Sequence, residues 1–284
     1  MATGTLPPTG LARRERRLSD QETERRMLSA ALAIVSRTGL TVSLDHLSFE
    51  DIIRDADVSR SAVYRRWPYK DLFFSDLVKQ LALDAAPGVV ADELKLMQEI
   101  ATSRADWLET PELRHRLLLE IFRQVAQVNF QAMCDSPGWR TYIALHATFM
   151  SLADGTLRDQ VQAALAASEL ARNGRIAQGW RQLTALFGYR LRPGAEITFE
   201  VLATLLTATM RGMVVMALSS PDVAECRITA RPFGAADPGE WSLPALGLAG
   251  LAWAYLESDP EVAWDAERIA SVRHALAEWA VPEV

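Results

Sequence analysis

The apolar residues near the start of the chain repeat with the period of an α-helix. Between Asp20 and Arg37 they occupy the i, i+3, i+4 and i+7 positions of one face, namely Leu28, Ala31, Leu32 and Val35. This spacing predicts an amphipathic helix, and Gly39 stands where such a helix ends. Because one face is apolar, we expect the helix to pack against the segments that follow.

A second, shorter helix and a tight turn are predicted next. After a loop over residues 41–47, Ser48 stands three residues before Asp51, which is an N-cap pattern for a helix that ends near Asp55. Ala56 and Asp57 then form the predicted turn, since aspartate tolerates a left-handed backbone conformation.

A third helix is predicted from Arg60 to Trp67, with Ser59 as its cap. Pro68 ends this helix, because proline disfavours the helical conformation in the residue before it. A fourth helix is predicted to open at Lys70-Asp71, and its inner side is formed by Leu72, Phe73, Leu77 and Leu81.

The remainder of the chain shows helical patterns broken by proline and glycine turns, with no alternating strand pattern. Helices are predicted over residues 89–108, 111–133, 138–151, 156–188, 196–219, 241–257 and 260–281. We therefore predict an all-α fold with three parts. These are a flexible basic arm (1–19), a smaller N-terminal helical part (20–85) and a larger helical part (86–284).

Charge is distributed unevenly along the chain. The 284 residues have a formal net charge of −6, but residues 1–85 hold 13 Lys and Arg against 12 Asp and Glu. The acidity therefore lies in the C-terminal two thirds. Four arginines fall within residues 11–17, and a second basic cluster is formed by Arg60, Arg65, Arg66 and Lys70. Such clusters can bind phosphates even on an acidic protein.

Several classes of protein are disfavoured by the composition. No apolar stretch approaches the roughly 18 residues that a membrane helix needs, and the polar N-terminus lacks the pattern of an export signal. Cys134 and Cys226 provide neither a disulfide framework nor a zinc site. We expect a soluble, cytoplasmic protein with no membrane partner, metal ion or cofactor.

The third predicted helix has the composition of a DNA-recognition helix. Val63 and Trp67 are four residues apart and can anchor it to the core, which leaves polar and basic side chains for a partner. The major groove admits one α-helix, arginine can pair with guanine, and alanine can contact the thymine methyl group. Tyrosine and lysine suit phosphate oxygens, and Lys70 stands near a helix start, where backbone N–H groups favour an anion.

The segment from Val58 to Leu72 resembles the DNA-binding signature of the TetR family of bacterial transcriptional regulators. The quoted residues are Val58-Ser59-Arg60-Ser61-Ala62-Val63-Tyr64-Arg65-Arg66-Trp67-Pro68-Tyr69-Lys70-Asp71-Leu72. They match nearly throughout a family pattern that has Ser early, Tyr in the middle, and Lys, an acidic residue and Leu at the end. The resemblance covers residues 20–85, and beyond them only the all-helical layout is similar.

The resemblance implies that residues 20–85 form an N-terminal helix-turn-helix DNA-binding domain and that residues 86–284 form a larger helical domain for effector binding and dimerisation. It also implies release from DNA when a small molecule binds the larger domain. By position, it directs Arg60, Ser61, Ala62 and Arg65 toward bases, and Tyr64, Arg66 and Lys70 toward phosphates. The chain departs from the family pattern in a longer link between Gly39 and Ile52, in Asp57 at the turn, and in the pair Arg65-Arg66. That pair replaces an aromatic residue and a histidine, so Arg65 can contact either a base or a phosphate.

A candidate effector site lies among aromatic and methionine residues of the acidic module, because helical bundles place ligand cavities between helices. The candidates are Trp107, Phe130, Met133, Trp139, His146, Phe149, Met150, Met210 and Met213. Plain core packing is the alternative for most of them. His146 either orients a ligand or is a satisfied core histidine, and Arg211 either pairs with an acidic residue or meets an anionic effector.

Two apolar segments, 196–219 and 243–256, are candidates for a homodimer interface, with closure of the monomer core as the alternative. We predict a transcriptional regulator, a repressor by family habit, that binds double-stranded operator DNA as a homodimer. A small, mostly apolar molecule releases it.

An enzyme and a helical adaptor are the rival classes. The sequence has no phosphate-binding glycine loop and no HExxH motif, and its four histidines are scattered, so no catalytic residue is predicted. An adaptor that binds protein would not require basic residues around a turn.

Overall fold

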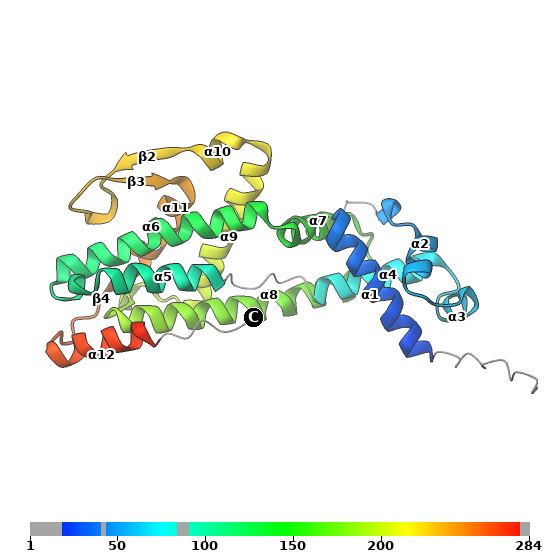
Figure 1. Ribbon diagram of the computed structural model, residues 1–284, viewed down its shortest axis with the longest axis horizontal. Coiled ribbons are helices and arrows are strands. Elements are labelled where there is room, and N and C mark those ends of the chain that lie inside the picture. The colour runs from blue at the N-terminus through cyan, green and yellow to red at the C-terminus, as the bar shows by residue number, and fades with distance from the viewer. Residues whose placement is uncertain (1–18, 41–43, 84–90, 279–284) are drawn as a thin grey trace, which may run out of the picture.

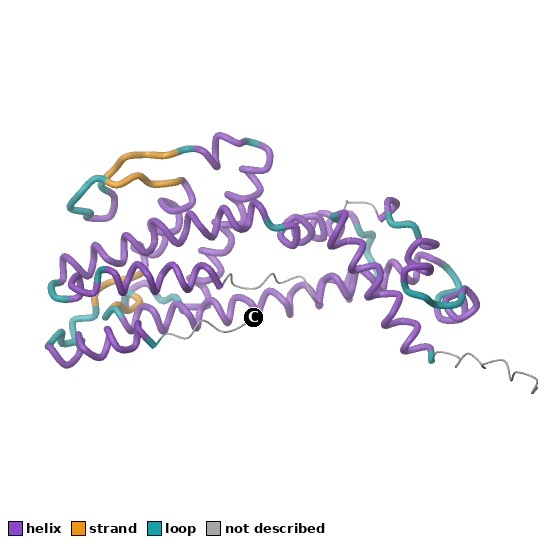
Figure 2. Tube along the Cα trace, viewed as in Figure 1, coloured by secondary structure: helices purple, strands orange, loops and turns teal. Residues whose placement is uncertain are grey.

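The chain folds into an elongated helical molecule (Figure 1, Figure 2). A computed structural model describes residues 19–40, 44–83 and 91–278. Helices α1 to α4 gather at one end, and the longer helices extend from there to the opposite end. The predicted all-α class is confirmed, with a few short strands in addition. The predicted basic arm, apart from Ser19, and the predicted boundary at residue 85 lie outside the described residues.

Two of the four N-terminal helices, α2 and α3, begin at the predicted caps Ser48 and Ser59. The four helices are α1 (Asp20–Thr38), α2 (Phe49–Asp55), α3 (Arg60–Arg66) and α4 (Lys70–Leu83), with a short 3-10 turn at Leu44–His46 before α2. The hydroxyl oxygens of Ser19, Ser48 and Ser59 each accept a hydrogen bond from the backbone N–H three residues later. Each cap thus satisfies a backbone donor that the first helical turn leaves unpaired.

The inner side of α4 differs from the prediction at one position. Phe73 and Leu77 are fully buried and Leu81 is 7% exposed, but Leu72 is 48% exposed. Successive residues of a helix are rotated by about 100°. Leu72 therefore lies beside the buried stripe, on a side that no neighbouring helix covers.

Eight further helices form the body, bounded mostly by the predicted turns. They are α5 (Ala91–Ser103), α6 (Pro111–Asp135), α7 (Pro137–Ser151), α8 (Thr156–Leu186), α9 (Phe199–Ser219), α10 (Pro221–Glu225), α11 (Leu243–Tyr255) and α12 (Ala266–Ala277). The single helix predicted over 89–108 is interrupted at Arg104, and a 3-10 turn over Ala105–Leu108 follows. With 31 residues, α8 is about 46 Å long and runs along much of the molecule (Figure 1).

The N-terminal helices share their core with the body. α4 packs against α8, and α1 packs against α7. One apolar cluster contains Met27 of α1 and Leu77 of α4 together with Trp139 of α7, Leu165 of α8 and Met210 of α9. Because this core is continuous and close-packed, a change at α7 or α8 is transmitted to the surface that carries α1 and α4.

The expectation of no strands is wrong. β1 (Tyr189–Leu191) pairs antiparallel with β4 (Leu256–Ser258), and β2 (Arg227–Ala230) pairs antiparallel with β3 (Gly239–Ser242). Each strand has three or four residues, which is too few to display an alternating pattern. The β2–β3 hairpin lies mostly between the helices predicted over 196–219 and 241–257.

The expectation that no segment has the length of a membrane helix is also corrected. By length and composition, α9 could cross a membrane. In the structure α9 packs against α6, α8 and α11, and Arg211 in its middle pairs with Glu169 of α8. Part of the apolar surface of α9 is therefore used for packing between helices. The second apolar segment, α11, lies between α6 and α9, which is the core-closing alternative.

Candidate functional site

The turn and the buried face of α3 hold this short helix in a defined orientation. Asp57 in the turn has a φ of 50°, a left-handed conformation that aspartate tolerates better than most side chains. On the inner side, Val63 and Trp67 have no exposed surface. The indole N–H of Trp67 donates a 2.9 Å hydrogen bond to Oδ2 of Asp76 on α4. α3 is thus fixed to α4 through packing and one buried polar contact.

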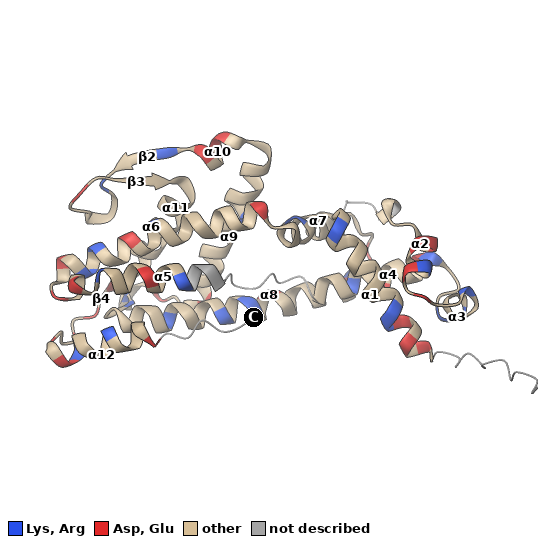
Figure 3. Cartoon of the chain, in the orientation of Figure 1, with Lys and Arg blue, Asp and Glu red and all other residues tan. Residues whose placement is uncertain are grey.

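Basic residues lie on α3, at one end of the molecule (Figure 3). Arg60, Ser61 and Tyr64 are exposed, as is Lys70 at the start of α4. Arg60 forms a 2.6 Å ion pair with Glu50 of α2, and Tyr64 rests edge-on against Phe49. Lys70 has no ion-pair partner among the described residues, so its charge is available to a phosphate.

Ala62 does not belong to this outer face. Its side chain is 6% exposed, and it follows Ser61 on the side of α3 that turns into the core. The expectation that Ala62 contacts a base is therefore corrected. In a helix of only seven residues, two anchors do not fix how far the buried face extends, which is why the sequence misplaced it.

Arg65 and Arg66 are held by carboxylates of neighbouring helices. Arg65 donates to Oδ1 of Asp20 at the start of α1, with Nε at 2.8 Å. Arg66 donates to Glu24 of α1 at 3.0 Å and lies 3.5 Å from Asp76 of α4. Arg66 is also stacked over Trp67, at 5.1 Å from the ring centroid. Arg66 thus joins three helices, and Arg65 can reach DNA only by leaving Asp20.

The carboxyl of Asp76 is the polar centre of this arrangement. Burial acts to raise its pKa, but hydrogen bonds from Lys79 and Trp67, together with the charges of Lys79 and Arg66, outweigh burial and lower the pKa. Asp76 is therefore ionised in the folded protein near neutral pH, where it accepts hydrogen bonds from Trp67 and Arg66.

The predicted effector residues separate into two regions. Phe130, Met133, Trp139 and Met210 are buried in the core shared with the N-terminal helices, and Phe149 and Met213 pack against that core. His146 of α7 lies next to Tyr142 in the same region. Met150 is 73% exposed, so its assignment to an enclosed site is corrected. The helix α7 ends one residue later, and the side chain of Met150 faces outward there.

Hydrogen bonds connect both His146 and Arg211 to neighbouring residues. Nδ1 of His146 donates to the carbonyl oxygen of Tyr142 at 2.9 Å, and the two rings are tilted by 49° with centroids 4.3 Å apart. Arg211 donates to Oε2 of Glu169 at 2.7 Å, and the hydroxyl of Tyr142 donates to Oε1 of the same carboxylate. His146 is thus satisfied through one ring nitrogen, and Arg211 pairs with an acidic residue.

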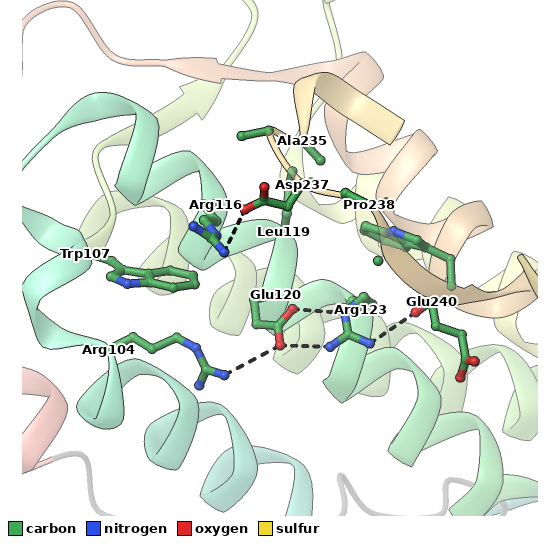
Figure 4. A pocket seen from close by; sticks show the side chains of 13 residues that line it. Arg104, Trp107, Arg116, Leu119, Glu120, Arg123, Ala235, Asp237, Pro238 and Glu240 are labelled. Carbon is green, nitrogen blue, oxygen red and sulfur yellow. Dashed lines mark hydrogen bonds and ion pairs between the residues drawn. The ribbon is translucent and has the colours of Figure 1, made fainter. Parts of the chain in front are cut away.

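Trp107 lies apart from the other candidates, in a cavity of about 370 Å³ between α6 and the β2–β3 hairpin (Figure 4). Arg104 and Arg116 stack on its ring, at 5.4 and 4.4 Å from the centroid. Arg116 pairs with Asp237 at 2.9 Å. The lining combines six charged residues with apolar ones, whereas the sequence suggested a mostly apolar site.

Glu120 forms the floor of this cavity. Burial acts to raise its pKa, but hydrogen bonds from Arg123 and Gln124 and the charges of Arg123 and Arg104 leave the pKa below its ordinary value. Arg123 also donates to the backbone carbonyl of Glu240 at 3.1 Å, which ties α6 to β3. The charged groups of the cavity therefore neutralise one another, and the site is distant from α3.

Two residues of the central region were not singled out from the sequence, Glu169 and Arg172 of α8. They lie three residues apart on one side of the helix, within a stretch rich in alanine. Arg172 is 9% exposed and its guanidinium lies over the ring of Trp139, at 4.6 Å from the centroid. Two charged residues one turn apart in an otherwise small and apolar segment are the signal that could have found them.

No family model matches this chain, and no curated protein matches it. Similar solved structures include one described as a TetR-family transcriptional regulator from Mesorhizobium loti, with 14% identity, 84% of this chain and 98% of that chain covered, and a TM-score of 0.45.

Two further similar structures are a repressor and a complex with a small molecule. SmeT, the repressor of the Stenotrophomonas maltophilia multidrug efflux pump SmeDEF, is 20% identical over 86% of this chain and 96% of its own, with a TM-score of 0.37. RolR in complex with resorcinol is 12% identical over 93% of this chain and 97% of its own, with a TM-score of 0.38. At this level of similarity, the roles of individual residues have to come from the geometry of this chain.

Proposed function

We propose that this chain is a DNA-binding transcriptional regulator, a repressor that leaves its operator when a small molecule binds. The observation that carries the proposal is α3 itself. It is a short helix after a tight turn, anchored by Val63 and Trp67, with a polar and basic outer face at one end of the molecule. A helix presented in this way fits the major groove, where its N-terminal residues meet base edges.

The exposed residues are assigned to base edges or to phosphates by their position on the helix and by their chemistry. Arg60 and Ser61, at the start of α3, are assigned to base edges, because the first residues of a recognition helix enter the groove most deeply. Tyr64 and Lys70 are assigned to phosphates, which tyrosine hydroxyls and lysine ammonium groups bind without regard to sequence. Arg65 is assigned to a phosphate or a base, which it contacts once its ion pair with Asp20 has broken. Arg66 holds α3 in position through its contacts with α1 and α4.

The effector is assigned to the region where α7, α8 and α9 meet, because this region is coupled to the DNA-binding end. α7 packs against α1 and α4, and α8 packs against α4. A ligand that changes the packing of α7 and α8 therefore moves α1 and α4, and with them α3. In a homodimer such a movement alters the separation of the two recognition helices and lowers operator affinity.

The dimer surface is assigned to the outer side of α8 and α9. Leu170 of α8 is 77% exposed, and Val215, Met216 and Leu218 of α9 are each about half exposed. Large exposed apolar side chains on two helices that pack against each other are a candidate surface for a partner to cover. A soluble, cytoplasmic regulator with residues 20–85 as its DNA-binding domain and residues 86–284 as its effector and dimerisation domain completes the proposal.

A gel-shift selection with pooled genomic fragments tests the function directly. The wild-type protein is expected to retain a small set of fragments, and the double variant Arg60→Ala, Lys70→Ala is expected to lose them. The matched control removes two exposed charges from the body, Arg175→Ala and Lys95→Ala. If the control lost binding as the double variant does, or if the wild type retained no fragment, the proposal would be wrong.

A further inference from the structure

The meeting point of α7, α8 and α9 contains a buried group of charged and aromatic side chains. Trp139 and Tyr142 come from α7, Glu169 and Arg172 from α8, and Arg211 from α9. Trp139 and Tyr142 are each 5% exposed, and Arg172 is 9% exposed. Charged groups are rarely placed so deep unless each of them has a partner.

Glu169 is fully engaged by two of its neighbours. Its Oε2 accepts a 2.7 Å hydrogen bond from Arg211, and its Oε1 accepts one from the hydroxyl of Tyr142. Burial acts to raise the pKa of Glu169, but the hydrogen bonds from Arg211 and Tyr142 and the charges of Arg211 and Arg172 lower it, so this carboxyl is ionised. The single negative charge of the cluster is therefore already bound to Arg211.

Arg172 is the cation that remains. It has no ion pair within 4.0 Å to any carboxylate of the described residues, and its Nη1 is buried without a hydrogen-bond partner. Burial, and then repulsion from Arg211, lower its pKa to about 10, which still leaves it charged at neutral pH. Its contact with the face of Trp139 compensates only part of the lost hydration.

We infer that Arg172 is the anchor for the carboxylate of a monoanionic effector with an aromatic or apolar body. This inference rests on the proposed function and gives its effector a chemical class. One carboxylate would satisfy the orphaned guanidinium and bring the net charge of Glu169, Arg172 and Arg211 from +1 to zero. Arginine binds carboxylates in a planar two-bond geometry, which favours this group over a neutral one.

The neighbours of the cluster account for the rest of the ligand. Trp139 stacks against Arg172, and Phe130, Met133 and Met210 belong to the same apolar core. Aromatic and methionine side chains form an adaptable lining for a flat apolar body. A dianion is disfavoured, because a second negative charge would meet Glu169 with no further unpaired cation. The earlier expectation of a mostly apolar ligand is thus refined to an apolar acid.

The probes are benzoate and 2-naphthoate, each compared with its neutral amide, in calorimetric titrations of the full-length protein at pH 7. The wild type is expected to bind at least one of the acids, and to bind its amide at least tenfold more weakly. Arg172→Gln is expected to lose at least tenfold in affinity for the acid. The control, Arg175→Gln, removes an exposed arginine one turn along the same helix and is expected to bind as the wild type does.

Two further measurements keep the outcome decisive. Melting temperatures check that the variants fold. If Arg172→Gln does not fold, Arg172→Lys replaces it. This variant is expected to bind the acid more weakly, because lysine cannot form the planar two-bond contact with a carboxylate. Operator binding is measured separately without any acid, so a failure of the proposed function is seen there. No binding of either acid, equal binding of acid and amide, or an equal loss in Arg175→Gln would overturn the inference.

Discussion

Arg65 of α3 donates a 2.8 Å hydrogen bond to Asp20, the first residue of α1, although the two residues are 45 positions apart in the chain. The contact places a carboxylate beside a helix that is proposed to approach phosphates. Arg65 is 36% exposed in its side chain and Asp20 is 58% exposed, so the pair lies at the surface. Exposed ion pairs of this kind contribute only about 0.2–1 kcal/mol, and DNA can compete with Asp20 for the arginine.

Asp20→Asn is therefore expected to strengthen operator binding. Removal of the competing carboxylate frees Arg65, and the energy of an exposed pair corresponds to a gain of about 1.4- to 5-fold in affinity. Titrations of labelled operator at fixed salt measure the change. Glu99→Gln removes a negative charge from α5 at the same formal cost and is the control. An unchanged or weaker affinity in Asp20→Asn would show that Arg65 plays no part in DNA binding.

Lys70→Ala and Arg60→Ala are expected to change DNA binding in different ways. Lys70 is assigned to a phosphate, so its loss should weaken binding to all sequences and reduce the slope of log K against log salt by about 1. Arg60 is assigned to a base, so its loss should relax the preference at one position of the site by about 1–3 kcal/mol. Salt titrations and a set of single-base operator variants separate the two effects.

Tyr64→Phe is the companion to these changes, because it removes a hydroxyl and leaves the ring against Phe49. Tyr64→Phe should weaken binding equally for all DNA sequences, as Lys70→Ala does. Unlike Lys70→Ala, it should leave the slope of log K against log salt unchanged. If Lys70→Ala had the same slope of log K against log salt as the wild type, the phosphate contact would have been assigned to the wrong residue.

The helices and their caps could be predicted from the sequence because they depend on neighbours in the chain. Ser48 and Ser59 cap residues three positions away, and Val63 and Trp67 are anchors at helical spacing. The partners of Arg65 and Arg66 could not be predicted, since they come from α1 and α4 and depend on the angle at which those helices cross α3.

In the effector region, too, some features could be predicted from the sequence and others could not. The sequence identified the apolar residues that form the shared core, including Phe130 and Trp139, because they recur at helical spacings. It could not show that Glu169 is fully bound by Arg211 and Tyr142, which leaves Arg172 without a carboxylate. That result depends on the register between α8 and α9, which no local pattern determines.

Asp76 is expected to make the N-terminal helices sensitive to acid. Its pKa is lowered from the ordinary 3.8 by Lys79, Trp67 and Arg66 against the effect of burial. A carboxyl with a depressed pKa contributes stability that is present above its unfolded pKa and is lost as the pH falls through its folded pKa. The wild type should therefore lose stability below about pH 4, and Asp76→Asn should be less stable at pH 7 but flatter in that acid range.

Denaturant unfolding, followed by tryptophan fluorescence at a series of pH values, measures this dependence. Asp154→Asn, which changes a fully exposed carboxylate, is the control and should follow the wild type. Parallel curves for Asp76→Asn and the wild type between pH 5 and the acid limit would contradict the role given to Asp76.

The last prediction concerns the assembly that binds the operator. Two recognition helices in successive major grooves must lie about 34 Å apart, and a single short helix such as α3 buries too little surface for specific binding alone. We therefore expect a dimer in sedimentation at micromolar concentration and a near-palindromic operator.

Leu170→Glu combined with Val215→Glu should yield a monomer, because burying two carboxylates in an apolar interface is costly. The monomer should bind the operator at least about 100-fold more weakly, as expected when the second half-site is no longer linked. Met150→Glu is the control, since Met150 is as exposed as Leu170 but lies on α7, outside the proposed interface. If the double variant stayed dimeric, the interface would lie elsewhere; if a monomer kept full operator affinity, the two-fold model of binding would be wrong.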